Sequence, residues 1–70
     1  MKNFKIDNTI INLETVTFVS IVDQEMYEGF GYAIEFNFIG GTKERFCYTM
    51  KKEEIEQKFN EIFLTMNDIL

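Results

Sequence analysis

The sequence predicts an α+β fold in which a bent antiparallel sheet of about five strands packs against a single C-terminal α-helix. Apolar residues in segment 55–66 recur at i, i+4, i+7, i+8 and i+11, which is one stripe of a 3.6-residue helix. Before this segment, apolar and polar residues alternate with the two-residue period of strands, interrupted by Gly, Asp and Asn. An amphipathic helix needs an apolar surface to cover, so we expect helix and sheet to share one core.

The N-terminal segments are expected to form a hairpin followed by a longer strand. Residues Lys2–Ile6 alternate, Asp7–Asn8 has the residue types of a tight turn, and Thr9–Asn12 forms the returning strand. Residues Leu13–Thr15 are expected to kink the chain before Val16–Val22, a strand rich in β-branched residues. Both faces of this strand are apolar, which is typical of a central strand or of one covered by a partner.

Segment Asp23–Gly29 interrupts the alternation with acidic residues and a glycine, and we interpret it as an exposed connection. The strongest strand follows at Phe30–Phe38, and the turn Gly40–Gly41 leads into another strand at Thr42–Thr49. Aromatic side chains line one face of both strands. We expect six of them to form the core under the helix: Phe30, Tyr32, Phe36, Phe38, Phe46 and Tyr48.

The register of this second hairpin follows from keeping the apolar faces together. A two-residue Gly-Gly loop would place Phe36 opposite Arg45 and so mix the two faces. A three-residue loop, Ile39–Gly41, with Gly41 in the left-handed conformation, avoids this. It predicts the pairs Ile34 with Phe46, Tyr32 with Tyr48, Phe30 with Met50, and Glu35 with Arg45.

The C-terminal helix is expected to begin near Thr49, a candidate N-cap, and to end at about Asn67. Glutamates at 53, 54 and 56 lie where the positive end of the helix dipole favours negative charge. These features support the helix independently of its apolar stripe.

Size and composition limit the classes of function. Seventy residues make one domain, residues 1–70. The formal net charge is −5, which is the wrong sign for neutralising phosphates and predicts no direct nucleic-acid partner and no anionic membrane surface. A single cysteine excludes an internal disulfide, and this thiol together with the lack of a long apolar run predicts a cytoplasmic protein.

No pattern of catalytic or metal-binding residues is present. The chain contains no His, and neither Ser20 nor Cys47 has an activating neighbour in sequence, so Cys47 is expected to be a partly buried strand thiol. The oxygen-rich segment Asp23–Gly29 does not match the spacing of a calcium-binding loop. We therefore expect a protein that is not an enzyme and has no cofactor, no metal ion and no small-molecule substrate.

The run Ile10-Ile11-Asn12-Leu13-Glu14-Thr15-Val16, followed by strands, a Gly-rich turn and one terminal helix, resembles a class of short bacterial and phage proteins. These proteins look like small rolls related to the pleckstrin-homology architecture, with a bent antiparallel sheet capped by one C-terminal helix. The resemblance covers nearly the whole chain and implies a fold. It implies no functional residue, and this chain offers about five strands where the full pleckstrin-homology fold has seven.

The first functional hypothesis is a protein-interaction module that forms a homodimer through an apolar strand face or a sheet edge. Its expected partner-binding residues are Val19, Ile21, Met26 and Tyr27. The alternative is a small acidic inhibitor of the phage type that occupies a basic nucleic-acid-binding groove of a host enzyme. Its acidic surface would be formed by Asp23, Glu25, Glu28, Glu53, Glu56 and Glu61.

Overall fold

The structure, a computed structural model, describes residues 3–69 and is α+β. Its strands form two antiparallel sheets, a two-stranded sheet β1-β2 and a three-stranded sheet in the order β3-β4-β5. The prediction of five antiparallel strands and one C-terminal helix is confirmed, although the strands are divided between two sheets. The elements are β1 (Asn3–Ile6), β2 (Thr9–Asn12), the 3₁₀ turn η1 (Leu13–Thr15), β3 (Val16–Met26), β4 (Gly29–Phe38), β5 (Lys43–Thr49) and α1 (Lys52–Ile69).

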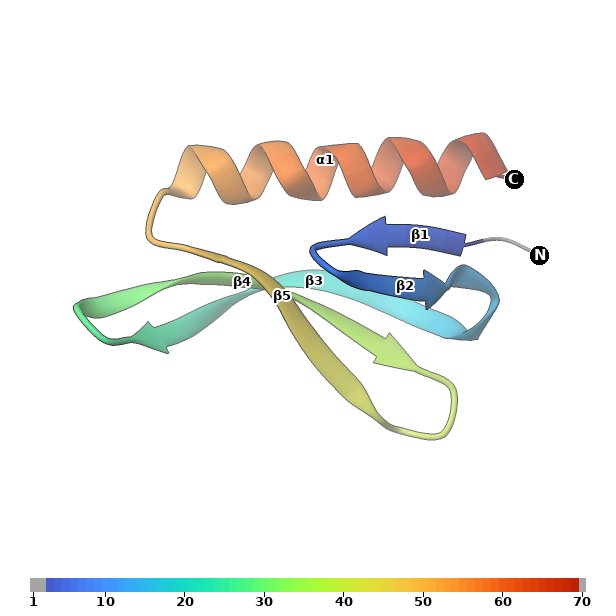
Figure 1. Cartoon of the computed structure of the whole chain (residues 1–70), viewed down its shortest axis with the longest axis horizontal. Coiled ribbons are helices and arrows are strands. Elements are labelled where there is room, and N and C mark those ends of the chain that lie inside the picture. Colours follow the sequence, from blue (N-terminus) through green and yellow to red (C-terminus); the bar gives the residue numbers. More distant parts are fainter. Residues whose placement is uncertain (1–2, 70) are drawn as a thin grey trace.

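Helix and sheets share one core, as the apolar stripe predicts. In Figure 1, α1 runs along the molecule with the β1–β2 hairpin next to it and the three-stranded sheet below. Phe59 and Met66 of α1 pack against the core, whereas Phe63 lies at the flank of the stripe and is 57% exposed. The buried cluster draws on both sheets and the helix: Ile6, Ile11, Leu13, Ile34, Phe36, Phe46, Ile55 and Ile62.

Strand β3 is longer than predicted. The exposed connection expected at Asp23–Gly29 is wrong, because β3 continues to Met26 and only Tyr27 and Glu28 form the turn to β4. The polar residues Asp23, Gln24 and Glu25 occur in a strand because pairing with β4 and exposure to solvent outweigh their low strand propensity. The hairpin projects beyond the first turn of α1 (Figure 1).

The three-residue loop between β4 and β5 is confirmed. The Phe38 N–H donates to the Thr42 carbonyl at 2.9 Å, and the Gly41 N–H donates to the Phe38 carbonyl at 3.1 Å. Gly40 and Gly41 have φ angles of 98° and 92°, a region that only glycine enters readily. The predicted pairs Ile34 with Phe46 and Glu35 with Arg45 are present.

A β-bulge in β5 then shifts its pairing with β4, so the side chains after the bulge point to other faces than predicted. Tyr32 pairs with Thr49 instead of the predicted Tyr48, and Cys47, within the bulge, has a φ of 60°. Tyr48 therefore turns outward and is 53% exposed. Phe30 is exposed too, at the projecting end of the β3–β4 hairpin, so the predicted aromatic core is wrong at Phe30 and Tyr48.

The helix begins at Lys52, three residues after Thr49. The Thr49 hydroxyl accepts a hydrogen bond from the Lys51 N–H at 3.1 Å and donates one to Glu54 Oε2 at 2.8 Å. Thr49 thus stabilises the entry to the helix without being its N-cap. The helix extends to Ile69, two residues past the predicted end.

Candidate functional site

Among residues 3–69, no strand pairs with the outer backbone edge of β3, because the sheet order places β3 at one end of β3-β4-β5. The hydrogen bonds of β4 show which groups face that edge. The Ile39 N–H just after β4 donates to the Thr15 carbonyl at 2.8 Å, whereas the Phe38 N–H donates to Thr42 on the β5 side. Since bonding alternates along an antiparallel strand, odd-numbered residues of β4 bond towards β3 and even-numbered residues towards β5.

The residues of β3 that lie opposite even-numbered β4 residues therefore direct their own N–H and C=O groups away from β4. Pairing with β4 places Val19 opposite Phe36 and Ile21 opposite Ile34. The same register extends to the acidic end of the strand. After the bulge between Val16 and Phe18, the residues whose backbone groups face the free edge are Val19, Ile21, Asp23 and Glu25.

The outer edges of β3 and β5 differ in charge. Strand β5 carries Lys43, Glu44 and Arg45, and its Cys47 N–H donates to the Asp7 carboxylate at 3.3 Å. Charged side chains and covering loops protect sheet edges against unwanted pairing. Between Val16 and Val22, β3 has no charged residue and no proline. Its edge is therefore open to another strand.

Two adjoining pockets that share Phe59 lie beside this edge, between β3 and α1, and we call them together the β3–α1 groove. Its apolar half is lined by Val19, Phe59, Ile62, Phe63 and Met66. Its acidic half is lined by Ile21, Glu53, Glu56, Gln57, Phe59 and Asn60. On the opposite face of β3, Phe18 is 61% exposed, so apolar side chains flank the free edge on both faces of the sheet.

The structure separates the four predicted partner-binding residues. Val19 and Ile21 are half-buried, share the face of α1 and line the groove. Met26 lies on the other face, where its Sδ would be 2.5 Å from a Cβ placed on Gly31. Tyr27 is fully exposed in the turn. Val19 and Ile21 thus belong to one surface, and Phe63, which is not among the predicted partner-binding residues, borders it.

The six predicted acidic residues are also divided. Glu53 and Glu56 line the groove, and Asp23 and Glu25 continue along β3 on the same face as Ile21. Glu28 lies in the β3–β4 turn. On the other flank of α1, Glu61 forms an ion pair with Lys58, whose Nζ lies 3.2 Å from the glutamate oxygen.

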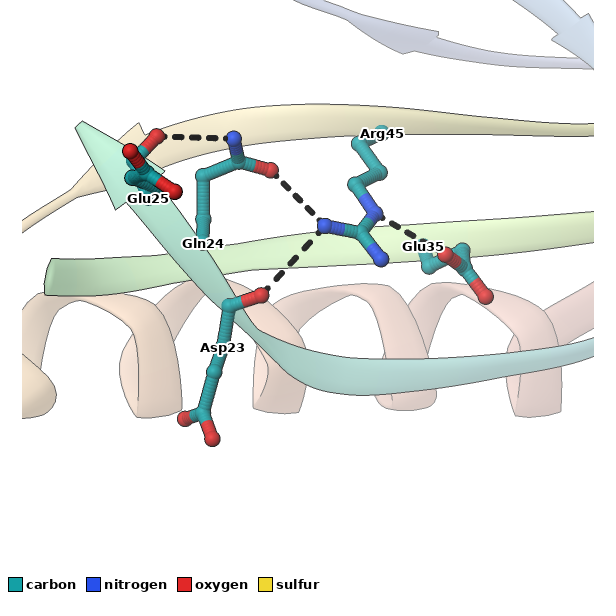
Figure 2. A network of polar contacts seen from close by, with 5 residues as sticks. All are labelled: Asp23, Gln24, Glu25, Glu35 and Arg45. Carbon is teal, nitrogen blue, oxygen red and sulfur yellow. Dashed lines mark hydrogen bonds and ion pairs between the residues drawn. The ribbon is translucent and has the colours of Figure 1, made fainter.

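On the face away from α1, a polar network ties the three strands together (Figure 2). Arg45 Nε donates to Glu35 Oε2 at 2.9 Å, and its Nη1 donates to Gln24 Oε1 at 2.9 Å and to the Asp23 carbonyl at 3.3 Å. Glu35 is buried, and the hydrogen bond from Arg45 lowers the pKa of its carboxyl below the usual value. The network holds β3 in place behind its free edge.

Replacing Glu35 by Gln is expected to remove a pH-dependent part of the stability. Because the folded-state pKa is lowered, the ionised carboxylate stabilises the fold above the ordinary glutamate pKa, and this contribution is lost as pH falls through the folded-state pKa. Urea unfolding should show a deficit for Glu35→Gln at pH 7 that shrinks towards pH 2. The control is Glu44→Gln, because Glu44 is exposed and lies next to Arg45 in β5. A deficit independent of pH would contradict this prediction.

Cys47 is partly buried, which confirms the expectation for its side chain. Burial raises the pKa of its thiol, and the nearby Asp7 carboxylate raises it further. The thiol is therefore protonated at neutral pH, the form that is a poor nucleophile. Within residues 3–69, no three His, Cys, Asp or Glu side chains gather in a way that could hold a metal ion.

Within the described part of the chain, α1 is not apolar enough to cross a membrane. Comparison of the chain with known protein families, curated proteins and solved structures finds no match. The resemblance to short bacterial and phage proteins stays a prediction.

Proposed function

We propose that the chain is a non-enzymatic protein-interaction module that forms a homodimer through the free edge of β3. The observation that carries this proposal is the stretch Val16–Val22, uncharged and unpaired on one side, beside an apolar groove. Strand addition to such an edge takes its affinity from backbone hydrogen bonds and its specificity from side-chain pockets.

The size of the chain supports association. Small domains rarely gain enough stability from one core, and oligomerisation is a common remedy. Burying an exposed phenylalanine contributes roughly 1.5–3 kcal/mol, and Phe18 and Phe63 flank the edge on opposite faces. A standard interface covers about 800 Å² per partner, roughly one sixth of the 5128 Å² surface of this chain.

Phe18→Lys is expected to weaken the dimer at least about tenfold, which corresponds to roughly 1.4 kcal/mol. The substitution removes an exposed apolar side chain and places a charge beside the proposed interface, while leaving the core untouched. Light scattering and sedimentation equilibrium measure the dissociation constant. Ile10→Lys, at a position on β2 that is 71% exposed against 61% for Phe18, is the matched control and should leave the dimer unchanged.

Two results would overturn the proposal. A wild-type chain that is monomeric at high micromolar concentration would remove the homodimer. A dissociation constant that is the same in Phe18→Lys and in the wild type would remove the β3 edge as its surface.

The acidic half of the groove favours a second candidate, the small acidic inhibitor that occupies a basic nucleic-acid-binding groove of a host enzyme. Glu53 and Glu56 lie beside Ile21, and Asp23 and Glu25 follow on the same face of β3. Added salt distinguishes the two functions, because it weakens binding to a basic groove and spares a dimer held by apolar contacts and backbone hydrogen bonds.

A further inference from the structure

We infer that the partner strand is β3 of a second copy of the chain, paired antiparallel, with the two-fold axis passing between the two copies of Ser20. This inference rests on the proposed function and specifies its partner and register. Antiparallel pairing of identical strands generates a closed two-fold dimer, in which each pair of contacts occurs twice.

Backbone hydrogen bonding limits the registers to a few. From Phe18 onwards, after the bulge, only odd-numbered residues of β3 direct N–H and C=O groups towards the free edge, so odd must face odd across the axis. With the axis at Ser20, Val19 faces Ile21 of the second copy on the α1 side. Phe18 then faces Val22 of the second copy on the other side. The first two pairs on each side of the axis are therefore apolar, and the next pair sets Asp23 opposite Thr17.

The neighbouring registers are less favourable, because they pair apolar side chains with polar ones. An axis at Ile21 places Val19 opposite Asp23, and an axis at Val22 places Ile21 opposite Asp23, so each buries a carboxylate against an apolar side chain. An axis at Val19 places Ile21 opposite Thr17, the extra residue of the bulge between Val16 and Phe18. The axis at Ser20 keeps Asp23 towards the ends of the paired region, where solvent reaches it.

This register also explains why the apolar half of the β3–α1 groove is exposed in the single chain. Because Val19 and Ile21 of both copies face the same side, both α1 helices lie on one face of a continuous six-stranded sheet, built from the three strands of each copy. The apolar halves of the two grooves then face each other across the axis. Phe63, 57% exposed in the single chain, becomes part of the interface.

A disulfide at position 20 tests the register. Ser20 occupies a non-hydrogen-bonded site across the axis, where paired Cα atoms lie about 4.5 Å apart, within the range of a disulfide. The parent chain carries Cys47→Ser to remove the native thiol, and Ser20→Cys is added to it. The matched control adds Val22→Cys instead, because this register separates the two copies of residue 22 by about 13 Å. Both variants are oxidised in a glutathione buffer and analysed by non-reducing electrophoresis.

We expect the Ser20→Cys chain to form at least ten times more covalent dimer than the Val22→Cys chain. Equal cross-linking, or more at Val22→Cys, overturns the register, while a parent that is still dimeric by light scattering leaves the proposed function standing. A monomeric parent at high micromolar concentration overturns both. An isotope-filtered NOE between the Val19 and Ile21 methyl groups of different copies reads the same register without a cysteine, and its absence in a dimer also counts against it.

Discussion

Phe36→Ala is expected to cost about 3–5 kcal/mol of unfolding free energy, the range found when a buried phenylalanine is truncated. Phe36 is 0% exposed at the centre of the core. Its ring meets Phe46 edge-on at 5.6 Å and stacks with Phe38 at 6.5 Å. A chain of this length has a total stability of only about 3.5–10 kcal/mol, so the variant should be marginally folded or unfolded at 25 °C.

Phe30→Ala is the matched control for this prediction. Phe30 lies on the same strand and the same alternating face as Phe36, yet it is 74% exposed, so its truncation should change stability by less than about 0.5 kcal/mol. Urea unfolding followed by circular dichroism measures both variants, at one fixed protein concentration because dimerisation adds to apparent stability. Equal losses in the two variants would show that the core is not centred on Phe36.

The contrast between Phe36 and Phe30 shows that strand periodicity predicts the face on which a side chain lies but not whether it is buried. Alternation correctly places both residues on one face of β4, because side chains of a strand point to opposite faces in turn. Alternation does not reveal where the covering helix begins. Phe30 is exposed because β4 starts in a hairpin that projects past α1, a length mismatch between elements distant in sequence.

The bulge at Cys47 cannot be predicted from the sequence for a different reason. The extra residue between the pairs of Phe46 and Thr49 requires a positive φ at Cys47, a conformation that sequence rules associate with Gly, Asn or Asp. The turn at Asp7, which has a φ of 53°, contains such residues, and the sequence predicts it. Sequence reasoning succeeds where local propensity decides the conformation and fails where packing imposes it.

The candidate surface was only partly predictable. Apolar residues on both faces of Val16–Val22 indicated a covered strand, and Val19 and Ile21 do border the groove. The openness of the β3 edge depends on sheet order, which no local pattern encodes. The prediction that Met26 and Tyr27 share a surface with Val19 depends on a loop at Asp23–Gly29. Because β3 extends through this segment, Met26 lies on the face of the sheet opposite to Val19, and Tyr27 lies in the turn between β3 and β4.

Gly31→Ala is the second substitution with a large expected effect, a loss of about 2–3 kcal/mol, the upper part of the usual range for overpacking. Gly31 is buried where the end of β5 passes over β4 on its way to α1. An added Cβ would lie 2.6 Å from the Thr49 carbonyl oxygen, 2.5 Å from Met26 Sδ and 3.1 Å from Met50 Cα. The backbone of Gly31 has no positive φ, so the cost comes from the clash and not from strain at the residue itself.

Two further variants separate the sources of this cost. Met26→Ala in the Gly31→Ala background removes the flexible thioether and should leave most of the loss in place, because the Thr49 carbonyl and Met50 Cα belong to a backbone held by Tyr32 and by the start of α1. Gly40→Ala has open space around its Cβ but a φ of 98°, and should cost about 1–2 kcal/mol from backbone strain alone. Urea unfolding ranks the three variants. Full recovery of stability on adding Met26→Ala would mean that β5 does not cross Gly31 at this distance, and the entry of the chain into α1 would then have to run elsewhere.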